Sequence, residues 1–305
     1  MKIALTGATG FLGRYVAKRL AAAGHQLQAW KRPSSDVSDY PVEPSSITWI
    51  EGSLQDPDAD APLLKGCDAV VHAALDHEPG KFQGGDGPDL LRFLERNILG
   101  TIRLIEAARA NNVARFVFVS TCAVHDEVLA DRPLDETHPL WPKTHYGAHK
   151  AAIEAFVSSY GRGQGYPICA LRPTGIYGLA HPWTASKWAR LIASVARGKI
   201  VSCKGGGKEV HADDVAKSIE ILLKAPESAY RGNAYSCCDR PISQEKVAQI
   251  AKKLSGSEAE IVDDGPYAPK NAIVTTKLQS LGMTFGGLPL LEKTIGEILE
   301  ASRKV

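Results

Sequence analysis

Residues 1–20 read MKIALTGATGFLGRYVAKRL, and this stretch decides the fold. A short apolar run leads into three glycines, and the segment after them repeats apolar residues at helical spacing. Gly7 permits a tight turn, Gly10 lets the backbone approach a pyrophosphate, and Gly13 lets helix and strand pack closely. The helix would also direct its first N–H groups and the positive end of its dipole at the loop. The pattern predicts phosphate binding; a turn that only packs the helix is the alternative.

The rest of the first half alternates strand-like runs with helical patterns. The runs QLQAW, ITWI, DAVVHAA and RFVFVS lack strict polar alternation, which indicates strands covered by helices on both faces. We therefore predict an α/β fold, a doubly wound parallel (Rossmann) sheet with a smaller C-terminal substrate lobe. Because the pattern loosens near residue 172, we expect residues 1–171 to form an NAD(P)-binding Rossmann domain. Residues 172–305 would form mainly a substrate-binding lobe, interleaved with the sheet.

Two stretches interrupt this alternation. Residues 33–46 are rich in proline and serine and are predicted to be a surface loop. Residues 76–89 form a long Gly/Pro/Asp-rich connection directly after a strand. Such loops are disordered or functional, and the carboxyl ends of parallel strands are where doubly wound sheets bind ligands.

The composition excludes several classes of partner. A formal charge of +2 gives no reason to expect nucleic acid or an anionic membrane. No apolar stretch approaches the roughly 18 residues of a membrane span. Six cysteines show no CxxC pair, which fits reduced thiols and predicts a cytoplasmic location.

The end of the second strand bears on the choice of dinucleotide. A carboxylate there would accept hydrogen bonds from the adenosine ribose and repel a 2′-phosphate. Lys31 and Arg32 stand there instead, and two cations favour NADP over NAD. The alternative is that both are solvated surface charges.

A tyrosine, a lysine and a hydroxyl have the spacing of an acid/base site. In HYGAHKAAIEAF, Tyr146 and Lys150 are four residues apart and hence on one helix face. A free tyrosine, with a pKa of about 10, is a poor base at neutral pH, so a nearby ammonium that stabilises phenolate would be useful. Ser120 and Thr121 end the buried run RFVFVS and could hold a substrate oxygen. The alternatives are a surface helix pair and hydroxyls that only satisfy strand-end backbone groups.

Several motifs in order carry a family resemblance. They are TGATGFLG, DAVVHAA, NILGTIRLIEAA, VSTCAV, YGAHK, LRPTGIYG and VHADDVAKSI. The chain resembles, over nearly its whole length, the extended short-chain dehydrogenase/reductases of the NAD(P)-dependent sugar epimerase/dehydratase group. Thr121 precedes Tyr146 by 25 residues, as in sugar 4-epimerases.

The resemblance implies roles for these residues. Tyr146 would be the acid/base, Lys150 would bind the nicotinamide ribose and lower the pKa of Tyr146, and Thr121 would orient the substrate. The implied cofactor-binding residues are Gly7, Gly10, Phe11, Leu12, Gly13, Lys31, Arg32, Ser53, Leu54, Ala73, Ala74, Asn97, Ser120, Tyr146, Lys150 and Pro173. It also implies a homodimer formed through helices near residues 97–110 and 145–160. Asp213 and Asp214 would be structural, and no metal is expected.

The sequence departs from the family pattern where substrates are chosen. Cys122 and Ala123 stand where 4,6-dehydratases carry Asp-Glu, which argues against dehydration. Gly207 stands where nucleotide-sugar epimerases carry an arginine that grips a diphosphate, with Lys208 and Lys204 as weaker substitutes. The segment between Arg172 and His211 is also shorter than expected for a site that encloses a nucleotide sugar. Ser53 replaces an aspartate that often contacts adenine, a change we expect to be tolerated.

These departures favour an NAD(P)-dependent reductase or dehydrogenase of a small substrate, sugar-derived ones included. The enzyme would transfer hydride between nicotinamide and a carbinol or carbonyl carbon. One alternative is an NDP-sugar 4-epimerase with tightly held NAD, and another is a non-catalytic NADP(H)-sensing or scaffold protein. The substrate candidates are His77, Cys122, His125, Tyr177 and Trp183. Cys122 could instead only pack, His125 could cap the loop, and tryptophans are mostly core residues.

Overall fold

The computed structural model describes residues 1–78, 85–265 and 267–304. Residues 79–84, within the connection 76–89, lie outside the described residues. The chain divides into two compact units. Unit 1 comprises Met1–Pro173, Val215–Cys237 and Ile273–Met283, and unit 2 comprises Thr174–Asp214, Cys238–Ala272 and Thr284–Val305. After Pro173 the chain therefore returns twice to unit 1.

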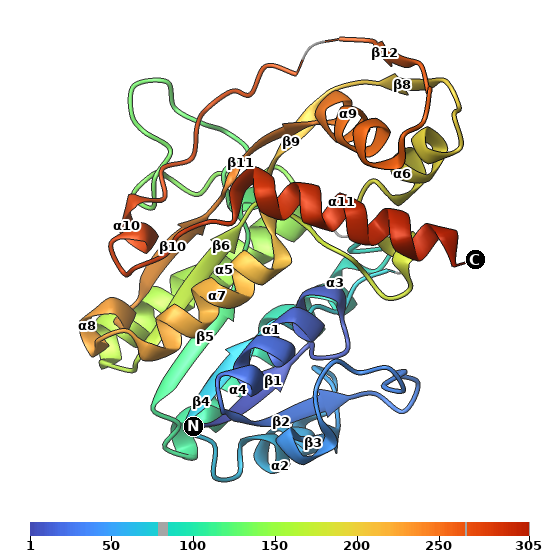
Figure 1. The fold of residues 1–305 in the computed structure, drawn as a ribbon. Coiled ribbons are helices and arrows are strands. Elements are labelled where there is room, and N and C mark those ends of the chain that lie inside the picture. The colour runs from blue at the N-terminus through green and yellow to red at the C-terminus, as the bar shows by residue number, and fades with distance from the viewer. Residues whose placement is uncertain (79–84, 266, 305) are drawn as a thin grey trace. The chain divides into compact units, whose positions relative to one another are not determined.

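Unit 1 is built on a seven-stranded sheet in which all pairs of neighbouring strands are parallel, in the order β10-β6-β5-β4-β1-β2-β3 (Figure 1). The strands are β1 Lys2–Thr6, β2 Gln26–Lys31, β3 Ile47–Glu51, β4 Ala69–His72, β5 Arg115–Val119, β6 Ile168–Pro173 and β10 Asn233–Cys237. Except in the edge strand β3, their central residues are buried, as the apolar runs predict. The predicted doubly wound parallel sheet is confirmed.

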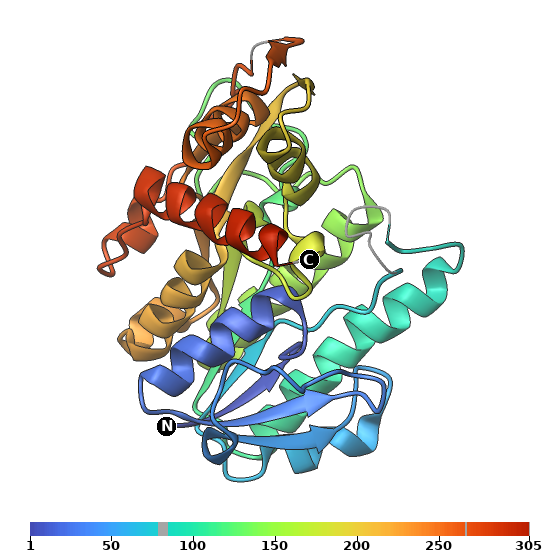
Figure 2. The same cartoon turned by 45° about the vertical axis from the view of Figure 1, so that its right-hand side comes forward.

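Helices cover both faces of this sheet. On one face α2 (Asp60–Leu64), α4 (Gly100–Ala110) and α5 (His145–Ser158) bury their apolar residues in a common core with the strands. α3 (Leu90–Leu94) and a π-helical turn (Glu95–Leu99) continue directly into α4, and Figure 2 shows them as one long rod. On the other face Arg19 of α1 (Phe11–Ala22) pairs with Glu220 of α7 (Ala212–Lys224) at 2.7 Å. Short helices α8 (Glu227–Tyr230) and α10 (Thr276–Gln279) complete unit 1.

Unit 2 has its own small sheets and core. β7 (Gly175–Tyr177) and β11 (Arg240–Ser243) flank β9 (Gly206–His211), while β8 (Val201–Cys203) pairs with β12 (Ile261–Asp263). Helices α6 (Ala189–Ala196), α9 (Gln244–Ser255) and α11 (Gly287–Arg303) pack with Tyr177, Val201 and Ile242 in one apolar cluster. Among the described residues, none of the helices is long and apolar enough to cross a bilayer.

Candidate functional site

The glycine loop lies between β1 and α1, against the residues that follow β4. Gly7 has a φ of +73°, a conformation that favours glycine, and a Cβ there would lie 2.7 Å from the backbone of Ala73 and Ala74. A Cβ at Gly13 would lie 2.0 Å from the carbonyl oxygen of Gly7. Because these neighbours are backbone atoms, neither position accepts a side chain. The loop therefore brings the predicted residues Ala73 and Ala74 beside Gly7.

This loop fits a dinucleotide phosphate group. Helix α1 begins at Phe11 with Gly10 as its N-cap, so the first N–H groups of the helix and its positive dipole end lie at the loop. Phe11, Leu12 and Gly13 form the first turn. The loop has no side chains at its glycines, so backbone N–H groups at the helix N-terminus can approach a phosphate group closely.

The end of β2 presents two cations. Lys31 is the last residue of the strand, and the exposed Arg32 follows it. The backbone N–H of Arg32 donates to the Ser35 hydroxyl at 3.1 Å, so the chain turns immediately after the strand.

Tyr40 links the 33–46 segment to the glycine loop, a contact that sequence reasoning missed. Its hydroxyl donates to the carbonyl oxygen of Ala8 at 3.0 Å. The Arg14 guanidinium lies over its ring at 5.1 Å and donates to the Asp39 carbonyl. The Tyr40 ring also meets Trp49 edge to face, with centroids 4.8 Å apart. The predicted surface loop is thus anchored by an aromatic residue, which was the only available signal in its sequence.

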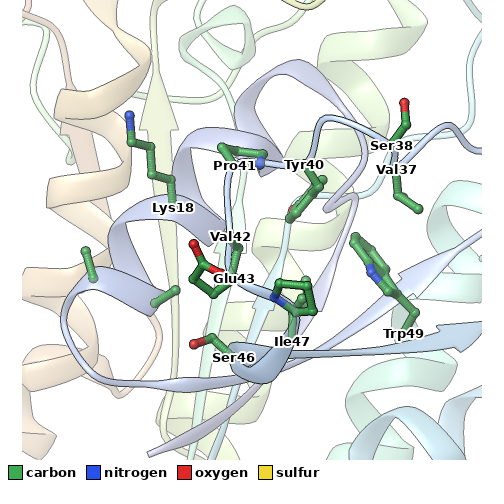
Figure 3. A pocket seen from close by; sticks show the side chains of 13 residues that line it. Lys18, Val37, Ser38, Tyr40, Pro41, Val42, Glu43, Ser46, Ile47 and Trp49 are labelled. Carbon is green, nitrogen blue, oxygen red and sulfur yellow. The ribbon is translucent and has the colours of Figure 1, made fainter.

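Figure 3 shows a cavity beneath this segment, of about 700 Å³. Its walls are the C-terminal half of α1, the 33–46 segment and the first residues of β3. Tyr40 and Trp49 contribute aromatic surface, and Lys18 and Glu43 contribute charge. None of these residues was a sequence candidate.

Asn97 and Leu54 act as supports for the chain that surrounds the loop. The Asn97 side chain accepts from the Asp76 N–H and donates to the Asp76 carbonyl, both at 2.8 Å. It also donates to the Phe93 carbonyl at 2.9 Å, so it fixes the segment after β4 to the following helix. Leu54 is buried, and a Cβ on Gly100 would lie 2.7 Å from its carbonyl oxygen. Ser53 accepts from the Gln55 N–H at 3.3 Å.

His77 lies beside a small cavity of about 120 Å³ formed by charged residues. Its Nδ1 lies 2.7 Å from the Glu78 carbonyl oxygen. Across the cavity Arg96 pairs with Asp76 at 2.9 Å. His77 therefore lies in the polar segment after β4 that the hydrogen bonds of Asn97 hold in place.

Thr121 and Tyr146 meet at the carboxyl end of β5. Thr121 caps a short 3₁₀ turn by accepting from the Ala123 N–H at 3.1 Å. Helix α5 starts one residue before Tyr146, and a Cβ on Gly147 would lie 2.5 Å from the Ala123 carbonyl oxygen. This close packing of helix on turn brings the Tyr146 phenol near enough to the Thr121 hydroxyl for that hydroxyl to act on the pKa of the phenol.

Burial sets the pKa values of Tyr146 and Lys150. It raises the pKa of Tyr146, although the Thr121 hydroxyl acts in the opposite direction. Burial also lowers the pKa of Lys150 to about 7, against the opposing charge of Glu154. The Lys150 ammonium donates to the Val119 carbonyl at 2.9 Å. Desolvation of the phenol therefore outweighs the favourable contacts in this arrangement. That Lys150 lowers the pKa of Tyr146 when the nicotinamide is bound stays a prediction.

A buried ion pair fixes the helix that carries Tyr146 and Lys150. Glu154, four residues after Lys150, accepts from Arg172 through both oxygens, the shortest contact being 2.6 Å. Both side chains are 4% exposed. Ser120 donates its hydroxyl to Glu154, so this predicted cofactor residue is held from the protein side. A charged residue inside the apolar run ICALRP was the sequence signal for this network.

His125 and Cys122 are engaged by the same network. The Nδ1 of His125 lies 3.2 Å from the Pro139 carbonyl oxygen, and its Nε2 lies 3.2 Å from Nη1 of Arg172. Burial lowers the pKa of His125 to about 4, so the ring is neutral. The Cys122 thiol donates to the Arg172 carbonyl at 3.0 Å. These contacts favour the loop-capping and packing interpretations over substrate contact.

The remaining candidates lie near the junction of β6 and β7. Pro173 ends β6 opposite Cys237 of β10. Tyr177 is 1% exposed, and its ring contacts Trp188 and His211 with centroids 5.4 and 5.0 Å apart. Trp183 packs against the same cluster. Tyr177 is therefore a core residue of unit 2, which favours the structural alternative for it.

Comparison with known proteins gives a consistent result. The model of the "NAD dependent epimerase/dehydratase family" matches residues 3–238. A ketoreductase of Stigmatella aurantiaca, acting on a 4-hydroxy-2-methyl-3-oxo-4-farnesyl-3,4-dihydroquinoline-1-oxide, is 30% identical over 86% of this chain and 75% of its own. The fold also matches the UDP-glucose 4-epimerase of Thermus thermophilus in complex with NAD, with a TM-score of 0.78, 23% identity and 99% coverage of each chain.

A larger plant protein is also similar. The trifunctional UDP-glucose 4,6-dehydratase/UDP-4-keto-6-deoxy-D-glucose 3,5-epimerase/UDP-4-keto-L-rhamnose-reductase of Arabidopsis thaliana is 28% identical over 92% of this chain. The chain spans only 44% of the length of that relative.

The depressed pKa of Lys150 makes a stability prediction. Between pH 7 and the normal lysine value the unfolded chain binds a proton that the folded chain does not, so folding becomes more favourable as pH rises. We therefore compare the unfolding free energies of the wild type and Lys150→Met at each pH. The wild-type value minus the variant value should increase by up to about 1.4 kcal/mol per pH unit above pH 7. Urea denaturation from pH 6 to 9 measures this. Lys224→Met replaces an exposed lysine and serves as the control: the wild-type minus variant unfolding free energy should not change with pH. If this difference is also independent of pH for Lys150→Met, the burial argument is contradicted.

Proposed function

The chain belongs to the NAD dependent epimerase/dehydratase family, whose members are NAD(P)-dependent enzymes, and on that premise we propose that it is a reductase or dehydrogenase of a small substrate. The observation that carries this proposal is the packing of the α5 start on the turn after β5, which places the Thr121 hydroxyl beside the Tyr146 phenol. It joins the end of a buried strand to a helix that carries a lysine one turn later. Both hydroxyls can then reach one substrate oxygen.

The cofactor would be held by backbone and by a few side chains. Gly7, Gly10 and Gly13 would receive the pyrophosphate at the start of α1. Lys150 and Pro173 would contact the nicotinamide end, as the resemblance implies. When bound, the nicotinamide supplies or accepts the hydride.

The protonation state of Tyr146 favours the reductive direction. A phenol with the ordinary pKa of about 10 is protonated at neutral pH, and burial raises the pKa of Tyr146 further. Reduction of a carbonyl requires a proton at the substrate oxygen, and the Tyr146 hydroxyl would donate it. Thr121 would hold the same oxygen through its own hydroxyl, which also keeps the phenol aligned.

Dehydration and a non-catalytic role receive less support. Cys122 and Ala123 supply neither carboxylate that an elimination needs. A sensing or scaffold protein has no use for a hydroxyl, a phenol and a buried ammonium in this order. For the cofactor, Lys31 and Arg32 at the end of β2 support NADP, since both could pair with a 2′-phosphate.

Exposed apolar residues support the homodimer implied by the resemblance. Leu99 is 62% exposed just before α4, and Phe156 is 43% exposed on α5. Large apolar side chains on neighbouring helices gain from being covered by a partner.

Replacing Tyr146 with phenylalanine tests the acid/base role. Loss of a general acid typically costs 10²- to 10⁴-fold in rate, so we expect kcat to fall by at least about 10²-fold while cofactor affinity stays within about twofold. Reduction of a panel of small ketones is followed by nicotinamide absorbance. The matched control is Tyr160→Phe, a tyrosine whose partner is Glu106. Unchanged turnover in Tyr146→Phe would refute the assignment.

Replacing Lys31 with aspartate tests the NADP preference. We expect NADP affinity to fall at least about tenfold, because a charge-assisted contact is replaced by repulsion, and NAD affinity to hold or rise. Isothermal titration calorimetry with both cofactors measures this, with Lys18→Asp as a control for net charge. Equal affinities of the wild type for NAD and NADP would contradict the proposed preference for NADP.

The dimer is tested by sedimentation velocity at micromolar concentration. The wild type should sediment as a dimer, and Leu99→Glu/Phe156→Glu as a monomer, because charges would be buried in the interface. Ile200→Glu, at an equally exposed apolar residue of unit 2, is the control and should stay dimeric. A monomeric wild type would contradict the proposed homodimer.

A further inference from the structure

One hydrogen bond ties the 33–46 segment to the glycine loop within unit 1. The Tyr40 hydroxyl donates to the carbonyl oxygen of Ala8 at 3.0 Å, across 32 residues of chain. Ala8 is 0% exposed and Tyr40 is half-buried. Burial raises the pKa of Tyr40, so its hydroxyl keeps its proton and remains a donor at physiological pH. The bond therefore joins the segment after β2 to the loop that would receive the cofactor.

Tyr40 contacts the central peptide of a turn. The Gly10 N–H donates to the Gly7 carbonyl at 3.1 Å, which closes the turn at its two ends. The peptide between Ala8 and Thr9 lies in the middle, and its orientation is what distinguishes the type I from the type II form of such a turn. Tyr40 holds the carbonyl of this peptide. Because the peptide is trans and planar, the Thr9 N–H points away from Tyr40.

The orientation of this peptide matters to a phosphate group. A phosphate at the start of α1 is attracted by N–H groups and by the positive end of the helix dipole, whereas a carbonyl oxygen repels it. The Tyr40 hydroxyl occupies the space in front of the Ala8 oxygen, so an anion cannot face that oxygen. The hydrogen bond thus removes a repulsive group from the surface that the loop offers to an anion.

The ring of Tyr40 is held by side chains of two elements. The Arg14 guanidinium lies 5.1 Å from the ring centroid, and it also donates to the Asp39 carbonyl. Trp49 of β3 meets the ring edge to face, with centroids 4.8 Å apart. Arg14 directly follows Gly13 in α1, so the helix that begins at the loop also contacts the chain that carries Tyr40. These contacts fix the direction in which the hydroxyl donates.

Packing of the ring does not explain the hydroxyl. Figure 3 shows Tyr40 and Trp49 in the wall of the cavity of about 700 Å³. A phenylalanine at this position would make the same ring contacts without bringing a polar group out of water. The hydroxyl is therefore explained by the carbonyl oxygen that it holds.

We propose that Tyr40 is a positioning residue for the cofactor: its hydroxyl holds the Ala8–Thr9 peptide in the orientation that admits the pyrophosphate. This rests on the part of the proposed function that places the pyrophosphate at the glycine loop. Tyr40 acts on binding and takes no part in proton transfer. The alternative is that the hydroxyl only satisfies a buried carbonyl, which would stabilise the fold and leave nucleotide affinity unchanged.

The experiment compares ADP with adenosine, which lacks both phosphates, by titration calorimetry of the full chain. Tyr40→Phe keeps the ring and removes only the hydroxyl. ADP affinity should fall about fivefold, the typical effect of one hydrogen bond, while adenosine affinity stays within about twofold. NADPH affinity, measured in the same way, should fall with that of ADP.

Two variants serve as matched controls. Tyr166→Phe also removes a buried tyrosine hydroxyl of unit 1, one that has no hydrogen-bond partner among the described residues. Ser38→Ala removes a hydroxyl of the 33–46 segment that donates to Asp36. Both variants should bind ADP as the wild type does. Thermal unfolding of each variant verifies folding.

Two results would overturn the role of Tyr40. One is an ADP affinity of Tyr40→Phe equal to that of the wild type. The other is an equal loss of adenosine affinity, which would indicate a general disturbance of the segment. Since the readout is binding and not turnover, it is independent of the Tyr146→Phe outcome. A wild type that binds no NADPH would contradict the proposed cofactor as well, whereas the two results above leave the proposed function standing.

Discussion

The buried pair between Glu154 and Arg172 is the interaction on which the arrangement of the site depends. Arg172 lies in β6, Glu154 in α5, and Ser120 at the end of β5 donates to the same carboxylate. The pair therefore fixes the helix that carries Tyr146 and Lys150 relative to two neighbouring strands. Breaking one partner of such a pair typically costs about 3–5 kcal/mol, because the other charge is left buried and unpaired. That penalty holds the phenol and the Thr121 hydroxyl in one geometry more firmly than packing alone.

The sequence was sufficient for the parts of the site that follow from local spacing and parallel topology. Glycines between a strand and a helix predict the loop at Gly7–Gly13, and the i, i+4 spacing puts Tyr146 and Lys150 on one helix face. Parallel strands end at a common edge, so the residues after β4 and β5 were expected on the same side as the glycine loop. The contact of Gly7 with Ala73 and Ala74 has this origin.

Contacts between distant residues could not be predicted. The hydrogen bond from Tyr40 to Ala8 spans 32 residues, and the composition of the 33–46 segment predicts only a surface loop. Glu209 and Lys187 are separated by 22 residues, in a part of the chain where the periodic pattern is weak. The direction of the Tyr146 pKa also needed the structure. Spacing places an ammonium near a phenol, but only the packing shows how far each group is removed from water and where the ammonium donates.

Lys150 and Lys187 each lie near a buried carboxylate, with different results. Lys150 loses affinity for its proton because burial removes its ammonium from water, and the opposing charge of Glu154 does not make up for this. Lys187 instead keeps a carboxylate to itself and so forms a neutral unit. Burial thus weakens the charge of the ammonium one helical turn from Tyr146 and keeps the phenol protonated, as the proposed proton transfer from Tyr146 requires.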